Sequence, residues 1–342
     1  VTFFPHLVAG PIIHHKQVMP QFNKPKKFTP DLKKITIGFI IFTIGLSKKV
    51  IIADTIGLYV DKFYSNLNFE FSPDLILSWL GSLSYAIQLY FDFSGYSDMA
   101  VGLSLIFGIF IPFNFNSPYK SLSIIDFWQR WHMSLTNFIG QYFFFPLTLK
   151  LTRSYSSQNI LINNLFSLII PLIITFFVIG IWHGANWTFA IYGLIHAFYM
   201  IINHLWRKQN LFEKIENTIL VKVIYWLITF TAVVFSMVIF RSESISDAII
   251  IYQGMLGMNS IEILSPNLKL LIVITFSMFL ILGTKSTFEI VNSFFDKEKL
   301  KNINYKNMIN KKIKIYSTLS GILLFLCLLQ LNTPSTFLYY QF

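Results

Sequence analysis

The stretch LFSLIIPLIITFFVIGIWHGANWTFAIYGLIHAFYMIINHLW (Leu165–Trp206) contains two apolar runs, Leu165–Trp182 and Trp187–Trp206, joined by only four residues. Each run has about 18–20 residues, which is the length that an α-helix needs to cross the hydrocarbon of a bilayer. The stretch therefore predicts two consecutive membrane-spanning helices with a histidine, His183, in the turn between them.

The rest of the chain has the same character. Its 342 residues are 54% hydrophobic and only 13% charged, whereas about a quarter of the residues of a soluble protein are charged. Further spans are predicted at Val221–Phe240, Leu268–Gly283 and Tyr316–Leu331, with two shorter ones, Leu75–Phe91 and Met99–Phe113, separated by DFSGYSD. Residues 35–60 predict a span followed by a tilted or interfacial helix, because Lys48, Lys49 and Asp54 interrupt the run.

We therefore predict an all-α, polytopic membrane protein. No Pro/Gly/Ser-rich linker or long hydrophilic block divides the chain, so residues 1–342 are expected to form a single membrane-embedded domain. The first residue is Val1 rather than methionine, and we expect the sequence to begin inside a longer protein.

The net charge of +11 arises from lysines and arginines that cluster between apolar runs, as the positive-inside rule requires. This distribution places segments 207–222 and 284–315 in the cytoplasm and segment 241–267 outside, with the His183 turn toward the outer half of the membrane. It also argues against a nucleic-acid partner, and membrane lipids are the expected surroundings.

His183 has two interpretations. A histidine within a membrane domain usually faces a cavity and serves function. It could equally be an interfacial loop residue beside tryptophans that anchor the helix ends, here Trp182 and Trp187. Asn186 is placed to hold a ring nitrogen of His183, and a neutral imidazole in this setting is able to accept a proton from a hydroxyl.

A second polar cluster is DFWQRWHMSLTNF, Asp126–Phe138. If residues 123–138 form a helix, Trp128, Trp131 and His132 share one face, and Asp126 and Arg130 pair at i and i+4. An amphipathic helix at the bilayer surface explains the same pattern.

A third cluster is YFDFSGYSDMAVG, Tyr90–Gly102, which contains Asp92, Tyr96 and Asp98. These side chains are candidates for a cation, a proton relay or a sugar. We interpret Asp98 as the cap of a helix beginning at Met99 and leave the role of Asp92 open.

Other histidines carry weaker signals. His6, His14 and His15 have no neighbouring acid or cysteine, so we assign no metal site. His196 and His204 lie within a predicted span, where contacts with neighbouring helices explain them better than catalysis does.

Several blocks together resemble the membrane-bound O-acyltransferase (MBOAT) family, in particular its alginate O-acetyltransferase branch. In order, they are FFPHLVAGPIIHHKQVMPQF, QLYFDFSGYSDMAVGLSLIFGIFIPFNFNSPY, DFWQRWHMSLTNFI, GIWHGANWTFAIYGLIHA, VIFRSESISDAIIIYQGMLG and FLYYQF. The resemblance implies a helical core with a funnel on each face joined by a tunnel, and further N-terminal helices that precede this chain.

The resemblance also implies a site. His183 matches the presumed catalytic histidine and His132 a second characteristic one. The candidate substrate or tunnel contacts are Trp131, Arg130, Asp126, Trp182, Asn186, Asp92 and Tyr96. No bound cofactor is implied.

The implied reaction transfers an acetyl group from a cytoplasmic thioester, either acetyl-CoA or an acyl carrier, in a bacterial inner membrane. The acceptor is a hydroxyl of an exported polysaccharide, or an extracytoplasmic partner protein that passes the acetyl group on. D-alanyl transfer to teichoic acid and peptidoglycan O-acetylation use the same scaffold and remain alternatives. A proton-coupled transporter that uses Asp92, Asp98, His132 and His183 as a relay is the alternative outside this class.

Overall fold

The computed structural model describes residues 3–6, 10–22, 30–67, 72–155, 157, 159–208, 218–259, 267–295, 303–331 and 338, and all the regular elements among them are helices. The first half contains η1 (Phe4–His6), α1 (His15–Phe22), α2 (Leu32–Ser47), η2 (Lys48–Ala53), α3 (Asp54–Ser65), α4 (Leu75–Ile106), η3 (Pro118–Lys120), α5 (Ile124–Arg130), α6 (Met133–Ile139), η4 (Gly140–Phe144) and α7 (Phe145–Ser154). The second half contains α8 (Ile160–Asn164), η5 (Leu165–Ile169), α9 (Ile170–His183), α10 (Trp187–Lys208), α11 (Ile219–Arg241), α12 (Ile245–Met255), α13 (Leu268–Gly283), α14 (Thr287–Phe295) and α15 (Ile303–Gln330).

The predicted all-α membrane architecture is confirmed. Six helical stretches in the described part of the chain are long and apolar enough to cross a membrane: Leu32–Ser65, Ile160–His183, Trp187–Lys208, Ile219–Arg241, Leu268–Phe295 and Asn307–Gln330. They include the predicted spans in the second half of the chain.

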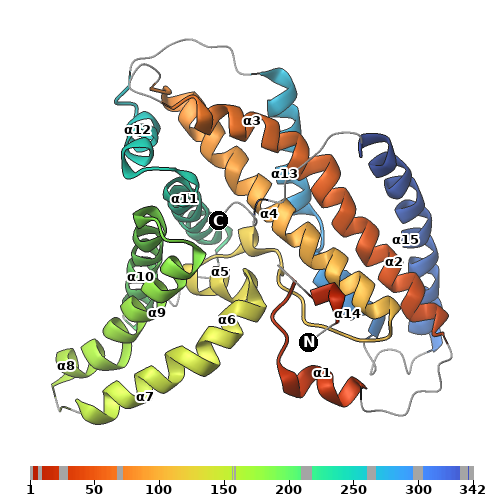
Figure 1. Cartoon of the computed structure of the whole chain (residues 1–342), viewed down its shortest axis with the longest axis horizontal. Coiled ribbons are helices and arrows are strands. Elements are labelled where there is room, and N and C mark those ends of the chain that lie inside the picture. The colour runs from red at the N-terminus through yellow and green to blue at the C-terminus, as the bar shows by residue number, and fades with distance from the viewer. Residues whose placement is uncertain are drawn as a thin grey trace.

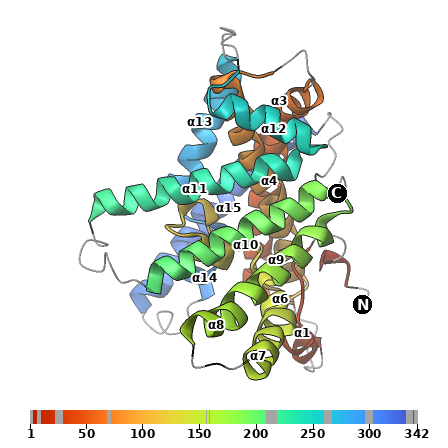
Figure 2. The same cartoon turned by 90° about the vertical axis from the view of Figure 1, so that its left-hand side faces the viewer.

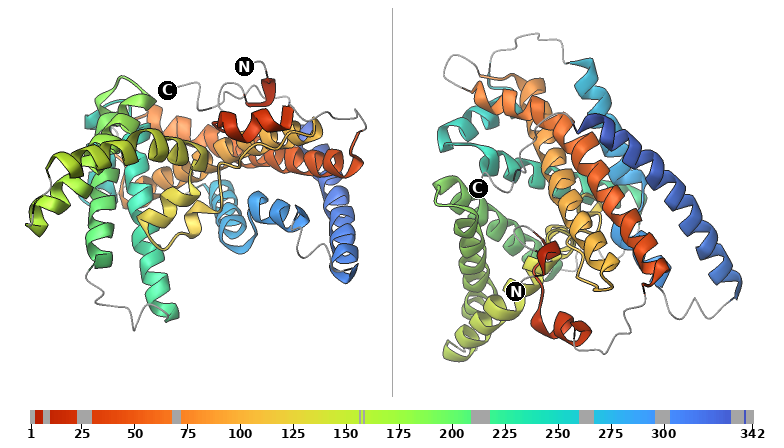
Figure 3. Two further views of the ribbon diagram at one scale, coloured as in Figure 1. Left: turned by 90° about the horizontal axis from the view of Figure 1, so that it is seen from below. Right: turned by 45° about the vertical axis from the view of Figure 1, so that its right-hand side comes forward.

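The helices form two groups around α4. On one side, α2 and α4 run side by side and α15 flanks α2 (Figure 1). On the other side, α9 packs along α10, and α10 against α11 (Figure 2). Viewed along the plane of α2 and α4, α10, α11 and α15 (green, teal and dark blue) extend away from that plane (Figure 3, left). Because α11 also contacts α4, the second group is held against the first.

Helix α4 corrects the predicted pair of short spans, Leu75–Phe91 and Met99–Phe113. It is a single helix of 32 residues, so Asp98 lies well inside it, and the prediction that Asp98 caps a helix beginning at Met99 is wrong. The helix also packs very closely on α2, because a Cβ atom at Gly95 would lie 2.7 Å from the carbonyl oxygen of Gly45. Small residues allow this approach, as they do between other membrane helices.

Ion pairs explain why two aspartates leave α4 unbroken. Lys48 Nζ lies 2.6 Å from Asp98 Oδ2, and Lys49 Nζ lies 2.5 Å from Asp92 Oδ1. The two lysines begin η2, a π-helical segment that continues from α2 into α3 without a break. The expected interruption of residues 35–60 is therefore a local change of helical geometry. Such π segments are frequent at functional sites.

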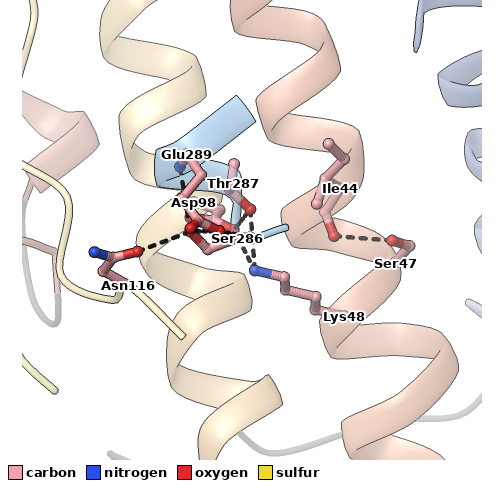
Figure 4. A network of polar contacts seen from close by, with 8 residues as sticks. All are labelled: Ile44, Ser47, Lys48, Asp98, Asn116, Ser286, Thr287 and Glu289. Carbon is pink, nitrogen blue, oxygen red and sulfur yellow. Dashed lines mark hydrogen bonds and ion pairs between the residues drawn. The ribbon is translucent and has the colours of Figure 1, made fainter. Parts of the chain in front are cut away.

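Each pair has a further partner. The Thr287 hydroxyl donates to Asp98 at 2.6 Å and accepts from Lys48 at 3.1 Å, which joins α14 to η2 and α4 (Figure 4). Asp92 also accepts the backbone N–H of Leu338 at 3.2 Å, and Lys49 also pairs with Asp54 at 2.7 Å. We refer to Lys48, Lys49, Asp54, Asp92, Asp98 and Thr287 as the lysine–aspartate network.

Candidate active site

A narrow cavity lies where α4, α5, α6, α9, α10 and α11 meet. Its open space of about 20 Å³ holds one water-sized molecule. The lining residues are Leu89, Phe93, Trp128, Trp131, His132, Leu135, His183, Tyr192 and Phe240. The structure thus brings together the two predicted catalytic histidines, His132 and His183, within walls that are otherwise almost entirely aromatic and aliphatic.

His183 is the last residue of α9. It reaches the cavity because α9 and α10 approach closely below it, where a Cβ atom at Gly180 would lie 2.3 Å from the carbonyl oxygen of Phe189. The imidazole lies edge-on to Phe240, with ring centroids 5.0 Å apart, and 6.2 Å from the ring of Tyr192. The ring therefore points inward from the turn rather than into the lipid or solvent.

The residues next to His183 in the turn do not line the cavity. Trp182 and Trp187 are 53% and 72% exposed, which suits anchors at a helix end. The Asn186 amide donates to the backbone oxygen of Glu243 at 2.8 Å, and its oxygen accepts the N–H of Thr188 at 3.2 Å. The prediction that Asn186 holds the His183 ring is therefore corrected: this side chain fastens the turn to the end of α11. These contacts put the turn and Glu243 on the same side of the protein.

His132 lies at a break that the sequence does not predict. The expected helix over residues 123–138 is two short helices, α5 and α6, because Trp131 is extended and His132 adopts a left-handed conformation with φ 43° and ψ 50°. Such a conformation costs a residue other than glycine about 1–3 kcal/mol and is concentrated at functional sites. Asn114 stabilises it, since its backbone oxygen accepts from Met133 N–H at 2.9 Å and its side-chain oxygen from the Ser134 hydroxyl at 2.5 Å.

The break turns the His132 ring into the cavity. The ring is edge-on to Phe93 at 4.7 Å, and its Nδ1 atom is buried with no hydrogen-bond partner in the described part of the chain. Burial lowers the pKa of His132 to about 3, and the nearby His183 contributes to the same shift. The imidazole is thus neutral at physiological pH, with one nitrogen able to donate and the other able to accept.

Two tryptophans complete this wall. Trp131 is stacked on Phe127 at 5.5 Å, and Trp128 donates its indole N–H to Nδ1 of His196 at 3.2 Å. That bond assigns the proton of a neutral His196 ring to Nε2. His196 is fully buried and orients Trp128 from behind. The interpretation of His196 as a contact between helices holds, although no sequence pattern predicts its position beside the cavity.

Of the seven predicted contacts only Trp131 lines the cavity; besides Trp182 and Asn186, the four that do not are Arg130, Asp126, Asp92 and Tyr96. The i,i+4 pair of Arg130 and Asp126 is confirmed at 2.8 Å, and Arg130 also donates to the backbone oxygen of Asn116 at 3.5 Å. Asp92 belongs to the lysine–aspartate network, and Tyr96 packs against the hydrophobic core. These residues support the site from outside it.

Comparisons with known proteins point to one enzyme family. A family model described as MBOAT, membrane-bound O-acyltransferase family, matches residues 1–240. The chain is 40% identical over 263 residues to the peptidoglycan O-acetyltransferase of Helicobacter pylori, an alignment that covers 77% of this chain and 47% of that protein. It is 37% identical over 267 residues to the probable alginate O-acetylase AlgI of Pseudomonas aeruginosa, covering 78% and 47%.

A third relative is the teichoic acid D-alanyltransferase of Bacillus subtilis. It is 32% identical over 247 residues, covering 71% of this chain and 60% of that protein. The chain spans about half the length of the first two relatives.

Proposed function

Because the chain belongs to the membrane-bound O-acyltransferase family, we propose that the whole protein moves an acetyl group from a thioester to a hydroxyl of an exported cell-envelope glycan, or to a partner protein that passes it on. The observation that carries the proposal is the meeting of His132 and His183 at one aromatic cavity. Two relatives are named as O-acetyltransferases of such polymers, peptidoglycan and alginate. Their similar identities favour neither polymer.

In the proposed reaction, His183 accepts the proton of the acceptor hydroxyl while the hydroxyl oxygen attacks the thioester carbonyl carbon. The new C–O bond forms, the C–S bond breaks, and the departing thiolate takes the proton from His183. The products are an ester and a free thiol, and no proton is gained or lost. General base catalysis of this kind is worth about 10²–10⁴-fold.

The neutral His132 ring complements this role. We assign its N–H to the thioester carbonyl oxygen, where negative charge develops in the transition state. A fixed donor in a site that excludes water stabilises such charge far more than water does. Trp128, Trp131 and Phe93 exclude water here, and the strained backbone of His132 fixes the direction of its ring.

The donor and acceptor are proposed to arrive from opposite faces, through funnels that meet at this cavity. The donor is acetyl-CoA or an acyl carrier on the cytoplasmic side, and the membrane is the bacterial inner membrane. The basic loops predicted to be cytoplasmic and the Glu243 side of the turn support this orientation. D-alanyl transfer is a related possibility, because a D-alanyltransferase is among the relatives.

The transporter alternative has less support from the structure. A proton relay needs Asp92 and Asp98 to face a path to the histidines. Both instead form ion pairs with lysines, and neither lines the cavity.

His183→Ala in the full-length protein tests the proposal. Acetyl transfer to the envelope glycan should fall by about 10²–10⁴-fold, while membrane insertion and expression stay unchanged. His204→Ala is a matched control, because His204 lies in the same pair of spans but does not line the cavity. Near wild-type acetylation by His183→Ala would contradict the proposal, and so would solute flux across vesicles without an acyl donor.

A further inference from the structure

A second group of polar side chains lies one helical turn from the cavity: Tyr64 of α3, Tyr85 and Gln88 of α4, and Arg241 at the end of α11. Tyr85 precedes Leu89 by four residues and Phe93 by eight, so it lies on the face of α4 that lines the cavity. We call Tyr64, Tyr85, Gln88 and Arg241 the outer polar cluster.

Each member has a buried polar atom without a hydrogen-bond partner among the described residues. These atoms are Tyr64 Oη, Tyr85 Oη, Gln88 Oε1 and Arg241 Nε. Tyr85 is fully buried, and Tyr64 and Gln88 are each 6% exposed. Buried polar groups in native proteins are paired in roughly 90% of cases or more, so an unpaired group on each of these four residues calls for a partner.

The cluster is continuous with the catalytic cavity. The Arg241 guanidinium lies over the Tyr64 ring, 5.0 Å from its centroid, and the Tyr64 and Tyr85 rings are 5.8 Å apart. Phe240, the residue before Arg241, lines the cavity and lies edge-on to the His183 ring at 5.0 Å. The cluster at the end of α11 is therefore next to the proposed base.

The cluster also reaches the surface. Arg241 Nη2 pairs at 3.3 Å with Asp61, whose side chain is 59% exposed. Arg241 is two residues from Glu243, which binds the turn that follows His183. This end of α11 is the side predicted to face outward, which is the side of the acceptor.

The unpaired groups define the chemistry of the partner. Arg241 Nε offers a donor, Gln88 Oε1 an acceptor, and the two phenol groups can do both. Sugar hydroxyls donate and accept in the same way. Asp61 already balances the charge of Arg241, so a neutral ligand fits better than an anion.

We propose that the outer polar cluster is the binding subsite for hydroxyl groups of a neutral carbohydrate acceptor, which it holds with one hydroxyl directed at His183. This inference rests on the proposed acyl transfer and adds the acceptor side of the site to it.

The experiment uses the full-length protein in lipid nanodiscs, with acetyl-CoA as donor. Chitotetraose serves as the neutral carbohydrate probe, and a tetrauronate and a serine-containing peptide serve as alternatives. Binding of each probe is measured by thermophoresis, and the donor thioester hydrolysis and transfer are followed separately.

Tyr64→Phe and Tyr85→Phe keep the rings and remove only the hydroxyls, and Arg241→Lys keeps the charge but removes Nε. Each should weaken chitotetraose binding and raise its KM by about two- to tenfold, the effect of one hydrogen bond. The maximal rate and the KM for the donor should not change. Tyr252→Phe is the matched control, because its hydroxyl already donates to the Phe235 backbone oxygen at 3.0 Å.

The outcomes separate the two proposals. A wild-type protein that neither hydrolyses nor transfers the thioester of acetyl-CoA, or that of an acetylated acyl carrier protein supplied in its place, refutes acyl transfer itself. A wild-type protein that transfers acetyl groups but binds only the tetrauronate or the peptide, or binds no probe, overturns the carbohydrate subsite. Cluster variants that bind chitotetraose as tightly as Tyr252→Phe does overturn it as well.

Discussion

The lysine–aspartate network and the histidine cavity both place polar groups in an apolar interior, but they treat those groups in opposite ways. In the network, Lys48 and Lys49 face Asp98 and Asp92 at 2.6 and 2.5 Å. At the cavity, His132 Nδ1 has no hydrogen-bond partner in the described chain, and the backbone of the same residue is left-handed.

This difference distinguishes groups that stabilise the fold from groups that can take part in catalysis. A buried charge is tolerated when it is paired, and removing one partner is costly because the other is left uncompensated. A buried neutral histidine without a hydrogen-bond partner adds no hydrogen bond that stabilises the fold. Its ring nitrogens remain able to bind a substrate. We therefore expect substitutions in the network to change stability and substitutions at the cavity to change acyl transfer.

Lys48→Met should have the largest effect on stability. Among the described residues it leaves Asp98 with only the Thr287 hydroxyl as a partner, and breaking a buried ion pair costs about 3–5 kcal/mol. The loss should appear as a lower unfolding midpoint of the purified protein in detergent, and as reduced expression.

The double variant Lys48→Met/Asp98→Leu is the control, because it removes both charges. It should recover most of the lost stability, as apolar replacements of buried ion pairs often do. If the single variant is as stable as the wild type, the network is not what holds α4 against α2.

Trp128→Phe and Trp226→Phe each remove one indole N–H hydrogen bond, the first at the cavity and the second away from it. Trp128 donates its indole N–H to His196 at the cavity, and Trp226 donates its own to the Tyr119 backbone oxygen at 2.8 Å. Each substitution leaves a buried acceptor unsatisfied, so each should cost about 1–3 kcal/mol of stability. Only Trp128→Phe should also reduce the rate of acetyl transfer, because Trp128 lines the cavity. Equal losses of activity in both variants would show that stability alone governs the rate.

The same contrast explains which parts of the fold were predictable. The spans around His183 follow from uninterrupted apolar runs, and the structure has helices there. The sequence predicts two spans in place of helix α4 because Asp92 and Asp98 resemble a helix boundary. Their partners are on another helix, Lys48 being 50 residues before Asp98. The charged lysines of η2 and the charged aspartates of α4 neutralise each other only in the folded protein. Neither segment alone reveals this pairing.

The site was predictable in its residue types but less so in its geometry. Histidines among tryptophans in a membrane chain identified His132 and His183, and the structure places both at the cavity. The left-handed conformation of His132 depends on Asn114, which lies in a different segment. Helical periodicity therefore predicted one continuous helix where the chain breaks, and it did not reveal His196 behind Trp128.

The smallest expected effect concerns the acid sensitivity of the cavity. The pKa of His132 is about 3 in the folded protein, whereas an unfolded histidine titrates near about 6.5. The unfolded state therefore binds the proton first as the pH falls. The contribution of the neutral His132 ring to the free energy of unfolding is fully present above about pH 6.5. This contribution is lost as the pH decreases toward 3, by at most about 1.4 kcal/mol per pH unit.

His132→Asn removes this titration and retains a side chain that tolerates a left-handed backbone. Its unfolding midpoint should fall less than that of the wild type between pH 7 and about pH 5, a range set by the two pKa values above. His15→Asn is the control, because His15 is exposed and does not line the cavity. If His132→Asn and the wild type lose stability in parallel, His132 has a partner in the folded protein. It would then belong with the paired groups of the lysine–aspartate network rather than with groups kept free for a substrate.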